Sequence, residues 1–222
     1  MAEEFLLDER EVRVLGSLIE KQLTTPEYYP LTLNALVHAC NQISDRDPVV
    51  AYDEQTVTRA LDSLREKNLA YIFYGSESRV PKYKHVVPEV LHLTPAQTAA
   101  LCVLLLRGPQ TVGEIRGRTG RLYEFKELQE VEATLEELTT HEPQPLVARL
   151  ARQPGRKESR YAQLLSGPVE VEAQETAARP PARIDARAGQ ERIARLETEV
   201  EALRSEVAEL KQQFDDFRKQ FD

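Results

Sequence analysis

The chain has 222 residues, 41% of them hydrophobic and 30% charged, and a formal net charge of −8 at pH 7. This length is enough for two small hydrophobic cores and an appendage, and it excludes a large enzyme core in addition to them. The charge argues against a generally basic nucleic-acid binder, but its distribution is uneven. Residues 1–90 carry 10 basic and 15 acidic side chains, residues 91–166 carry 10 and 9, and residues 167–222 carry 9 and 13.

Neither a membrane span nor a secretion signal is expected. The longest apolar run, at residues 99–106, is about half of the roughly 20 residues that a bilayer requires. The first ten residues are acidic, whereas a signal peptide begins with basic ones. We therefore expect a cytoplasmic protein without a membrane partner. Cys40 and Cys102 each fall in an apolar helical stripe, which predicts buried free thiols and not a disulfide or a metal site.

The first 90 residues read as three helices followed by a hairpin. Residues 8–11 fit a capping box at the start of a first helix that ends near residue 22. A second helix is predicted from residue 32, and a third follows an N-cap at Asp53. Extended apolar residues 69–74 and a returning basic segment then predict two antiparallel strands.

A second copy of this pattern lies about 75 residues further on. Residues 94–97 combine a Thr N-cap, a Pro at the first helical position and a Gln at the third. In the third helix of the copy, apolar residues recur at the offsets found in the first. The matching sets are Val57, Leu61 and Leu64, and Val131, Leu135 and Leu138. Three helices followed by a hairpin is the order of a winged helix-turn-helix, so we predict two such domains in tandem.

The expected fold is therefore mainly α with small β-hairpins, in the α+β class. We place the first winged-helix domain at residues 1–90 and the second at residues 91–166. Residues 167–183 contain three prolines and no periodicity, which predicts a flexible linker. Residues 184–222 are predicted to form a coiled-coil helix.

The coiled-coil prediction rests on apolar residues that alternate spacings of three and four. The dimerisation residues predicted from this seam are Ile193, Leu196, Val200, Leu203, Val207, Leu210, Phe214 and Phe217. β-branched residues at one core position and Leu at the other favour a parallel two-stranded coil, and thus a homodimer. In a parallel pair the flanking charges attract, whereas a fully overlapped antiparallel pair places like charges together. The alternative is a helix that folds back onto its own domains.

Enzymatic motifs are absent from the sequence. It contains no Gly-rich phosphate loop, no GxSxG elbow and no Cys or His pairs at metal-binding spacing. The four histidines are scattered and read as ordinary core or surface residues. We expect neither catalysis nor a cofactor.

Double-stranded DNA is the first candidate partner. In a winged helix the third helix enters the major groove, and the hairpin contacts phosphate or the minor groove. The third helix of the second copy is too acidic for this role, so the candidates lie on the first copy's helix, both hairpins and a basic segment at 116–121. They are Gln55, Thr58, Arg59, Arg79, Lys82, Lys84, Arg116, Arg118, Arg121, Arg149, Arg152, Arg156, Lys157 and Arg160. The alternatives are a basic hairpin with no partner, and a protein-interaction scaffold whose hairpins meet an acidic protein.

Several segments resemble motifs of the YceH-like bacterial proteins. They are Thr25-Pro-Glu-Tyr-Tyr-Pro-Leu-Thr-Leu-Asn-Ala-Leu36, Ala39-Cys-Asn-Gln42, Arg46-Asp-Pro-Val49, Arg121-Leu-Tyr-Glu-Phe125, Glu130-Val-Glu-Ala-Thr-Leu135 and Pro154-Gly-Arg-Lys-Glu-Ser-Arg-Tyr161. The resemblance covers nearly the whole chain and implies a tandem winged-helix fold, but it supplies no catalytic residues. The chain differs from the family pattern at Ile43 and Asp45, where Lys and Asn are usual, and at Gln163, where His is common.

Overall fold

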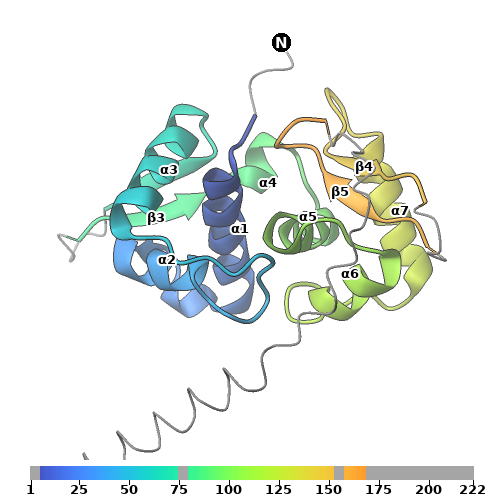
Figure 1. The fold of residues 1–222 in the computed structure, drawn as a ribbon, viewed down its shortest axis with the longest axis horizontal. Helices are drawn as coiled ribbons and strands as arrows, with labels where there is room; N and C mark the ends of the chain where they lie inside the picture. The colour runs from blue at the N-terminus through green and yellow to red at the C-terminus, as the bar shows by residue number, and fades with distance from the viewer. Residues whose placement is uncertain (1–5, 75–79, 153–157, 169–222) are drawn as a thin grey trace, which may run out of the picture. The chain divides into compact units, whose positions relative to one another are not determined.

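The computed structural model describes residues 6–74, 80–152 and 158–168, and it shows a mainly helical chain with small antiparallel sheets (Figure 1). The predicted α+β class is thereby confirmed. The first part contains α1 (Glu9–Thr24), the 3-10 helix η1 (Pro26–Tyr28), β1 (Leu31–Thr32), α2 (Leu33–Cys40), α3 (Glu54–Glu66), β2 (Ala70–Phe73), β3 (Lys82–His85) and α4 (Val87–Val90). The second contains α5 (Pro95–Arg107), α6 (Val112–Thr119), α7 (Leu128–Thr139), β4 (Val147–Arg149) and β5 (Tyr161–Gln163).

The helices begin where the sequence places capping residues. Asp8 accepts hydrogen bonds from the backbone N–H of Arg10 and of Glu11, and the Glu11 side chain accepts one from the Asp8 N–H. Thr94 and Gln97 form the same reciprocal capping box at the start of α5. Such caps satisfy backbone donors that the helix itself leaves unpaired. The predicted starts of α1 and α5 are therefore confirmed.

The two hairpins are embedded in sheets of the same plan. In the first sheet the strand order is β1-β3-β2, and Leu31 lies opposite Tyr83. In the second, β4 pairs with β5, and Gln110 exchanges backbone hydrogen bonds of 2.9 and 2.7 Å with Tyr161. The residue after each bridging position, Thr32 or Thr111, caps the next helix. The internal repeat thus extends from sequence spacing to strand pairing.

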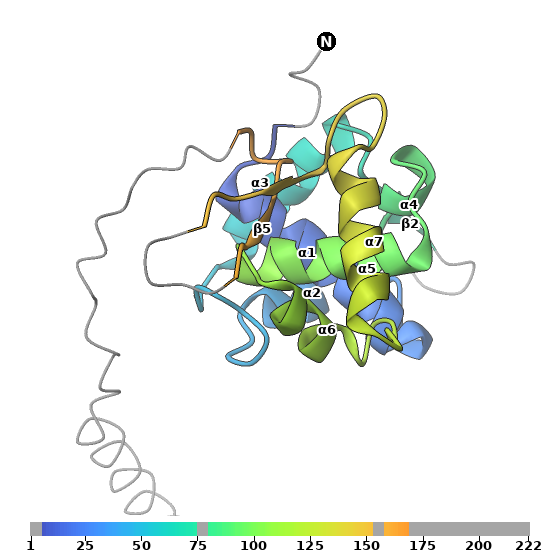
Figure 2. The ribbon, with the colours of Figure 1, turned by 90° about the vertical axis from the view of Figure 1, so that its right-hand side faces the viewer.

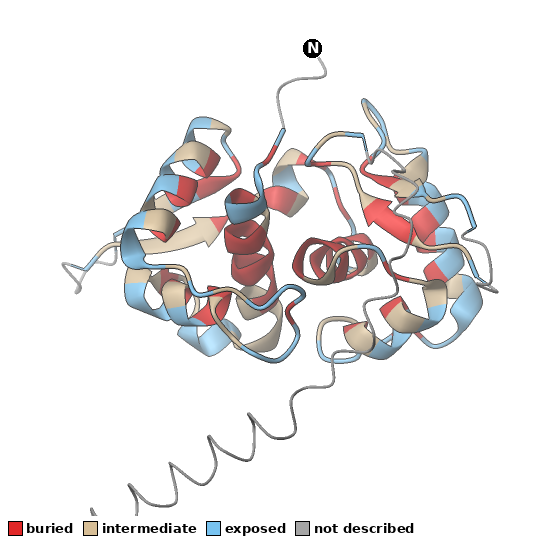
Figure 3. Cartoon of the chain, viewed as in Figure 1, coloured by how far each residue is buried: buried red, intermediate tan, exposed pale blue. Residues whose placement is uncertain are grey.

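α1 and α5 form the centre of the core and pack against each other (Figure 3). Both expose little surface because their neighbours cover them, and α7 lies across α5 (Figure 2). At the contact between α1 and α5, a Cβ added to Gly16 would lie 2.8 Å from Leu106 Cδ2 and 3.2 Å from Leu105 Cβ. Only glycine allows this close approach. The Cys102 Sγ, on α5, donates to the Gly16 carbonyl over 3.5 Å.

Residues Met1–Val171 form one compact unit, so both halves of the repeat belong to a single body. We refer to residues 6–93 as the first half and to residues 94–168 as the second half, after the caps that open α1 and α5. The predicted linker at 167–183, apart from Gly167 and Pro168, and the predicted coiled coil at 184–222 lie outside the described residues. Within the described residues, no helix has both the length and the apolar character needed to cross a bilayer.

Candidate nucleic-acid interface

The outward face of α3 carries the three candidates predicted for base contacts. Gln55 and Arg59 are exposed, and Thr58 is half-buried. The Thr58 hydroxyl donates to the Glu54 carbonyl over 2.8 Å, so its proton is already engaged within the helix. Gln55 and Arg59 are therefore the α3 side chains best placed to donate to a ligand.

The outer face of the first sheet brings aromatic and basic side chains together. Tyr71 lies opposite Lys84, and Phe73 lies opposite Lys82. Because alternate residues of a strand share a face, all four side chains are on the same side of the sheet. Tyr71 and Phe73 remain 45% and 43% exposed, and both lysines are half-buried. We call this set, Tyr71, Phe73, Lys82 and Lys84, the aromatic-basic face.

Tyr71 and Phe73 are the two members of this face that sequence reasoning missed. The apolar content of residues 69–74 predicts an extended strand but does not distinguish its two faces. The sequence shows only that Ala70 and Ile72 alternate with the aromatics Tyr71 and Phe73, and the structure identifies the aromatic positions as the exposed ones. A strand with large aromatics on its outer face exposes more apolar surface than folding requires.

The inner face of the same sheet is part of the core. His85 is buried, and its backbone N–H donates to the Tyr29 hydroxyl over 2.7 Å. Its Nδ1 accepts a hydrogen bond from the Val87 N–H, and its Nε2 has no partner among the described residues. Burial lowers the pKa of His85 to about 4, so the ring is neutral at physiological pH. His85 is thus a core residue beneath the aromatic-basic face.

The second hairpin presents its cations to an acidic helix. Arg149 and Arg152 line a groove of about 700 Å³ that is also lined by Glu132, Glu136 and Glu158. Glu132 and Glu136 are exposed on α7. Three carboxylates therefore stand against two guanidinium groups, and they reduce the positive potential available to phosphate.

Arg160 lies near the start of α6. Burial raises the pKa of the Glu114 carboxyl. The hydrogen bond from the Thr111 N–H and the charges of Arg160 and Arg118 lower it by more, so the net shift is downward. Glu114 is the capping-box partner of Thr111. The charge of Arg160 thus stabilises an ionised carboxylate of the protein itself.

The basic segment at 116–121 does not act as one cluster. Arg116 donates to the Lys126 carbonyl over 2.7 Å, which anchors the turn before α7. Arg118 lies 3.9 Å from Glu114, and both residues line up along α6. Arg121 is exposed, and no hydrogen bond or ion pair joins it to another described residue. Arg118 and Arg121 border a cavity between the halves, whereas Arg116 does not.

The remaining predicted site residues lie outside the described residues. They are Arg79, Arg156, Lys157, Ile193, Leu196, Val200, Leu203, Val207, Leu210, Phe214 and Phe217.

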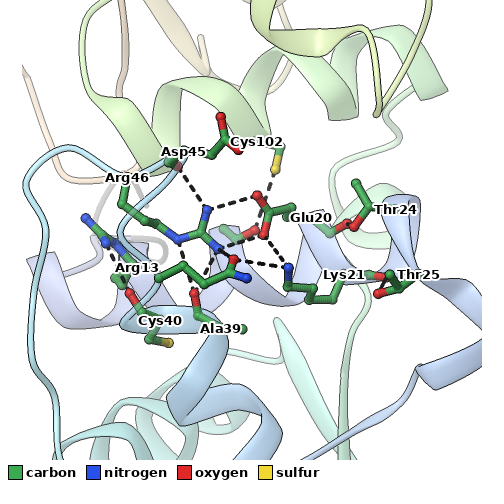
Figure 4. Close-up of polar contacts among 12 residues, drawn as sticks. Arg13, Glu20, Lys21, Thr24, Thr25, Ala39, Cys40, Asp45, Arg46 and Cys102 are labelled. Carbon is green, nitrogen blue, oxygen red and sulfur yellow. Dashed lines mark hydrogen bonds and ion pairs between the residues drawn. The ribbon is translucent and has the colours of Figure 1, made fainter. Parts of the chain in front are cut away.

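A buried ion pair ties the loop before α3 to α1 (Figure 4). Arg46 Nη1 and Nη2 donate to the two carboxylate oxygens of Glu20 over 2.9 and 2.6 Å. The same guanidinium donates to the Ala39 carbonyl at the end of α2, through Nε at 3.2 Å and Nη2 at 2.8 Å. Burial would raise the pKa of Glu20, but the hydrogen bonds and charge of Arg46, with Lys21, hold it below 4.5. The pair therefore exists as two charges joined through a two-point contact.

A second buried arginine, Arg13 of α1, donates to backbone carbonyls in the same region. Buried Arg13 donates to the carbonyls of Cys40 and Pro48 over 3.2 and 2.5 Å. Burial, followed by the charge of Arg46, lowers the pKa of Arg13. Two adjacent guanidiniums thus hold the segment from Cys40 to Pro48 against α1, and this explains structural roles for Ala39, Cys40 and Arg46 of the family-like motifs.

The described residues include two cysteines and no cluster of metal-ligating side chains. Cys40 and Cys102 are both buried and free, as predicted. Burial raises the pKa of the Cys40 thiol to about 11, which keeps it protonated and poorly nucleophilic. Among the residues described, no group of three or more His, Cys, Asp or Glu side chains is placed to hold a metal ion.

The α+β architecture and the repeated helix and hairpin units define a chain of two similar halves fused through α1 and α5. Residues 7–156 match the family described as "Protein of unknown function, DUF480", and the chain belongs to this family. The resemblance to the YceH-like proteins agrees with this membership and is confirmed.

Related proteins are found in several bacteria. A UPF0502 protein of Opitutus terrae is 57% identical over 199 residues, which cover 90% of this chain and 84% of the relative. A UPF0502 protein of Citrifermentans bemidjiense is 57% identical over 89% of each chain. One from Geobacter sulfurreducens is 55% identical over 90% of this chain and 91% of its own.

Proposed function

We propose that this chain is a non-enzymatic, tandem winged-helix protein of the cytoplasm that binds double-stranded DNA as a homodimer. In this proposal α3 is the helix that enters the major groove, and the first hairpin is a wing that contacts the DNA backbone. The role is that of a transcriptional regulator or a nucleoid-associated protein.

The aromatic-basic face is the observation that carries the proposal. Lys82 and Lys84 supply charges for phosphate, and their cross-strand neighbours Phe73 and Tyr71 supply exposed apolar surface beside them. Lysine neutralises phosphate charge, and the tyrosine hydroxyl is among the donors that bind the phosphate and sugar of DNA. Gln55 and Arg59 of α3 add donors that suit base edges or phosphates.

The second hairpin is assigned a smaller share of the contact. Arg149 and Arg152 lie in a groove with three carboxylates, and Arg160 acts on Glu114. These cations are partly neutralised before any DNA approaches. The unevenness favours binding that is centred on the first half of each subunit.

Salt dependence tests DNA binding most directly. We expect the full chain to bind a random-sequence duplex, with affinity falling about 100-fold between 50 and 200 mM salt if ~4 phosphates are neutralised. Fluorescence anisotropy on a labelled duplex measures this. Replacement of both Lys82 and Lys84 by Ala should weaken binding about tenfold for all sequences, whereas Arg10→Ala, at an exposed cation of α1, should not. No binding at 50 mM salt would reject the proposal.

Dimerisation is tested separately on the full chain. Sedimentation should give a dimer, and Leu203→Glu should give a folded monomer because like charges would face each other in the seam. The monomer should also bind DNA more weakly, since bivalent binding by two subunits is lost. A variant that sediments as the wild-type dimer would exclude the proposed seam.

A second candidate, a scaffold that binds an acidic protein, is favoured by the exposure of Tyr71 and Phe73. Exposed aromatic side chains are enriched at protein interfaces, where they supply much of the binding energy. Capture of partners from cell extract with and without nuclease separates the two functions. Partners that survive nuclease and are lost on Tyr71→Ser with Phe73→Ser would support the scaffold.

A further inference from the structure

A cavity of about 410 Å³ lies between the two halves, within the compact unit formed by Met1–Val171. One wall comes from the end of α1 and from the segment after α2. The other wall comes from the end of α5 and from residues 117–122, which include the end of α6. Glu20 and Lys21, drawn in Figure 4, belong to the first wall.

Cations outnumber carboxylates in this lining. Four basic side chains, Lys21, Arg107, Arg118 and Arg121, face two acidic ones, Glu20 and Asp45. Glu20 is already engaged by buried Arg46, which does not itself line the cavity. Asp45 is engaged by Arg107 in an ion pair across the two halves. The cavity therefore keeps an excess of positive charge.

The excess charge resides on Arg118 and Arg121. The contact of Arg118 with Glu114, at 3.9 Å, is the longest ion pair recorded among the described residues. Arg121 has no ion pair or hydrogen bond with another described residue. Lys21 Nζ is oriented by Gln42 Oε1 at 3.1 Å and Glu20 Oε2 at 3.2 Å, which leaves one of its three protons for a ligand.

The rest of the lining suits the organic part of a ligand. Val103, Leu106 and Leu122 provide apolar surface. Gly117 and Gly120 have no heavy atom within 4 Å of the position that a Cβ would take, so this wall is open to a ligand. A volume of a few hundred Å³ with apolar walls and a few convergent polar groups is typical of small-molecule sites.

We propose that this cavity binds a small organic phosphate ester of about mononucleotide size. Arg118 and Arg121 would hold the phosphate in two-point contacts, and Lys21 would add a point charge. The ester's organic group would lie on the apolar surface. Because both halves line the cavity, the bound ligand stabilises the contact between them. This site is separate from the aromatic-basic face and does not depend on DNA binding.

The first experiment uses the full chain with adenosine monophosphate, adenosine and citrate as probes in isothermal titration calorimetry. The monophosphate should bind at least tenfold more tightly than adenosine, which lacks the charge, and than citrate, which has carboxylates instead. It should also raise the melting temperature. Equal affinity for adenosine, equal affinity for citrate, or no binding of the monophosphate at millimolar concentration would each overturn the proposal.

Variants and amide shifts locate the site. Arg118→Ala with Arg121→Ala should raise the dissociation constant of the monophosphate at least tenfold. The pair Lys82→Ala with Lys84→Ala, on the aromatic-basic face, should change it less than twofold. In the wild-type protein, NMR shifts should concentrate at residues 20–25 and 117–122. Shifts confined to other residues, or an unchanged constant in the Arg118 and Arg121 variant, would contradict the assignment.

Discussion

The two halves of the compact unit share a plan but differ in what they bury and expose. Counted from the caps Asp8 and Thr94, Glu20 of α1 and Leu106 of α5 occupy the same helical position. Glu20 is held by a buried arginine, whereas Leu106 is part of an apolar helix whose residues 97–106 are all buried. One plan of strands and helices thus accommodates an ionic anchor in one half and an apolar core in the other.

The exposed surfaces differ in the same way. The first half carries the aromatic-basic face, whereas in the second half Arg149 and Arg152 share a groove with Glu132 and Glu136. The backbone plan is common to both halves, whereas their surface groups differ. This difference separates the candidate DNA contact of the first half from the second hairpin, whose arginines share a groove with carboxylates.

Breaking the ionic anchor should have the largest effect. Arg46→Ala leaves the Glu20 carboxylate buried without its partner, so we expect a loss of about 3–5 kcal/mol in the free energy of unfolding. Urea titration followed by circular dichroism measures it. Arg65→Ala, which breaks the exposed pair with Asp62, should cost less than about 1 kcal/mol.

Replacing both partners separates two explanations. Either the ion pair itself stabilises the fold, or the loss in Arg46→Ala comes only from leaving one buried charge unpaired. Glu20→Met with Arg46→Met should recover much of the loss, because no unpaired charge remains. The lowered pKa of Glu20 adds a pH test. The ionised Glu20 contributes to the free energy of unfolding above pH 4.5, and this contribution is lost as pH falls below that value. If Arg46→Ala lowered the free energy of unfolding no more than Arg65→Ala does, the buried ion pair would not be a major source of stability.

His85 should make the first half sensitive to mild acid. Tyr83 and Tyr161 are equivalent in the two sheets, so Gln163 stands where His85 does, and it cannot titrate. Burial lowers the pKa of His85 from 6.5 to about 4, so the unfolded chain binds a proton in this range that the folded chain does not. The contribution of His85 to stability is complete above about pH 6.5, and its loss should lower the free energy of unfolding by about 3 kcal/mol as pH drops to 4.

Unfolding titrations at pH 7, 6, 5 and 4 measure this slope. His85→Gln, the residue of the second half, should flatten it, and His38→Gln, at an exposed histidine of α2, should leave it unchanged. An identical slope in wild type and His85→Gln would mean that His85 does not cause the acid sensitivity.

The sequence predicted local structure well because local structure has local causes. Capping residues such as Asp8 and Thr94 and the repeated stripe at Val57 and Val131 mark helix starts and buried faces directly. The contact of α1 with α5 could not be predicted from such signals. Gly16 and Leu106 are distant in sequence, and the apolar pattern of a helix does not indicate which other helix it packs against.

The candidate site was harder to predict because charge alone does not indicate availability. Arg116 and Arg149 look alike in sequence, yet one donates to a backbone carbonyl and the other lines a groove with glutamates. The apolar content of residues 69–74 does not reveal that Tyr71 lies on the exposed face of β2.

A side chain at Gly16 should destabilise the close contact between the halves. Gly16 and Cys102 are also equivalent when counted from their caps, and they meet where α1 and α5 touch. Gly16→Leu would push against Leu105 and Leu106, so we expect a loss of about 1–3 kcal/mol from overpacking. Thermal unfolding measures it.

An exposed glycine of the second half provides the matched control. Gly113 in α6 has open space around a Cβ, and Gly113→Ala should stabilise by about 0.5–1 kcal/mol. A Gly16→Leu variant as stable as wild type would mean that the two helices can separate without cost.

The second hairpin should show the smallest effect on DNA affinity. Arg149→Ala with Arg152→Ala should weaken binding less than threefold at 50 mM salt, against about tenfold for Lys82→Ala with Lys84→Ala. The reason is that Glu132 and Glu136 already oppose the two arginines. Replacing these glutamates by Gln should therefore strengthen DNA binding and steepen its salt dependence, because it would remove negative charge from the groove that the arginines line. Equal losses from the two double-alanine variants would show that the glutamates do not neutralise the second hairpin and that both halves grip DNA alike.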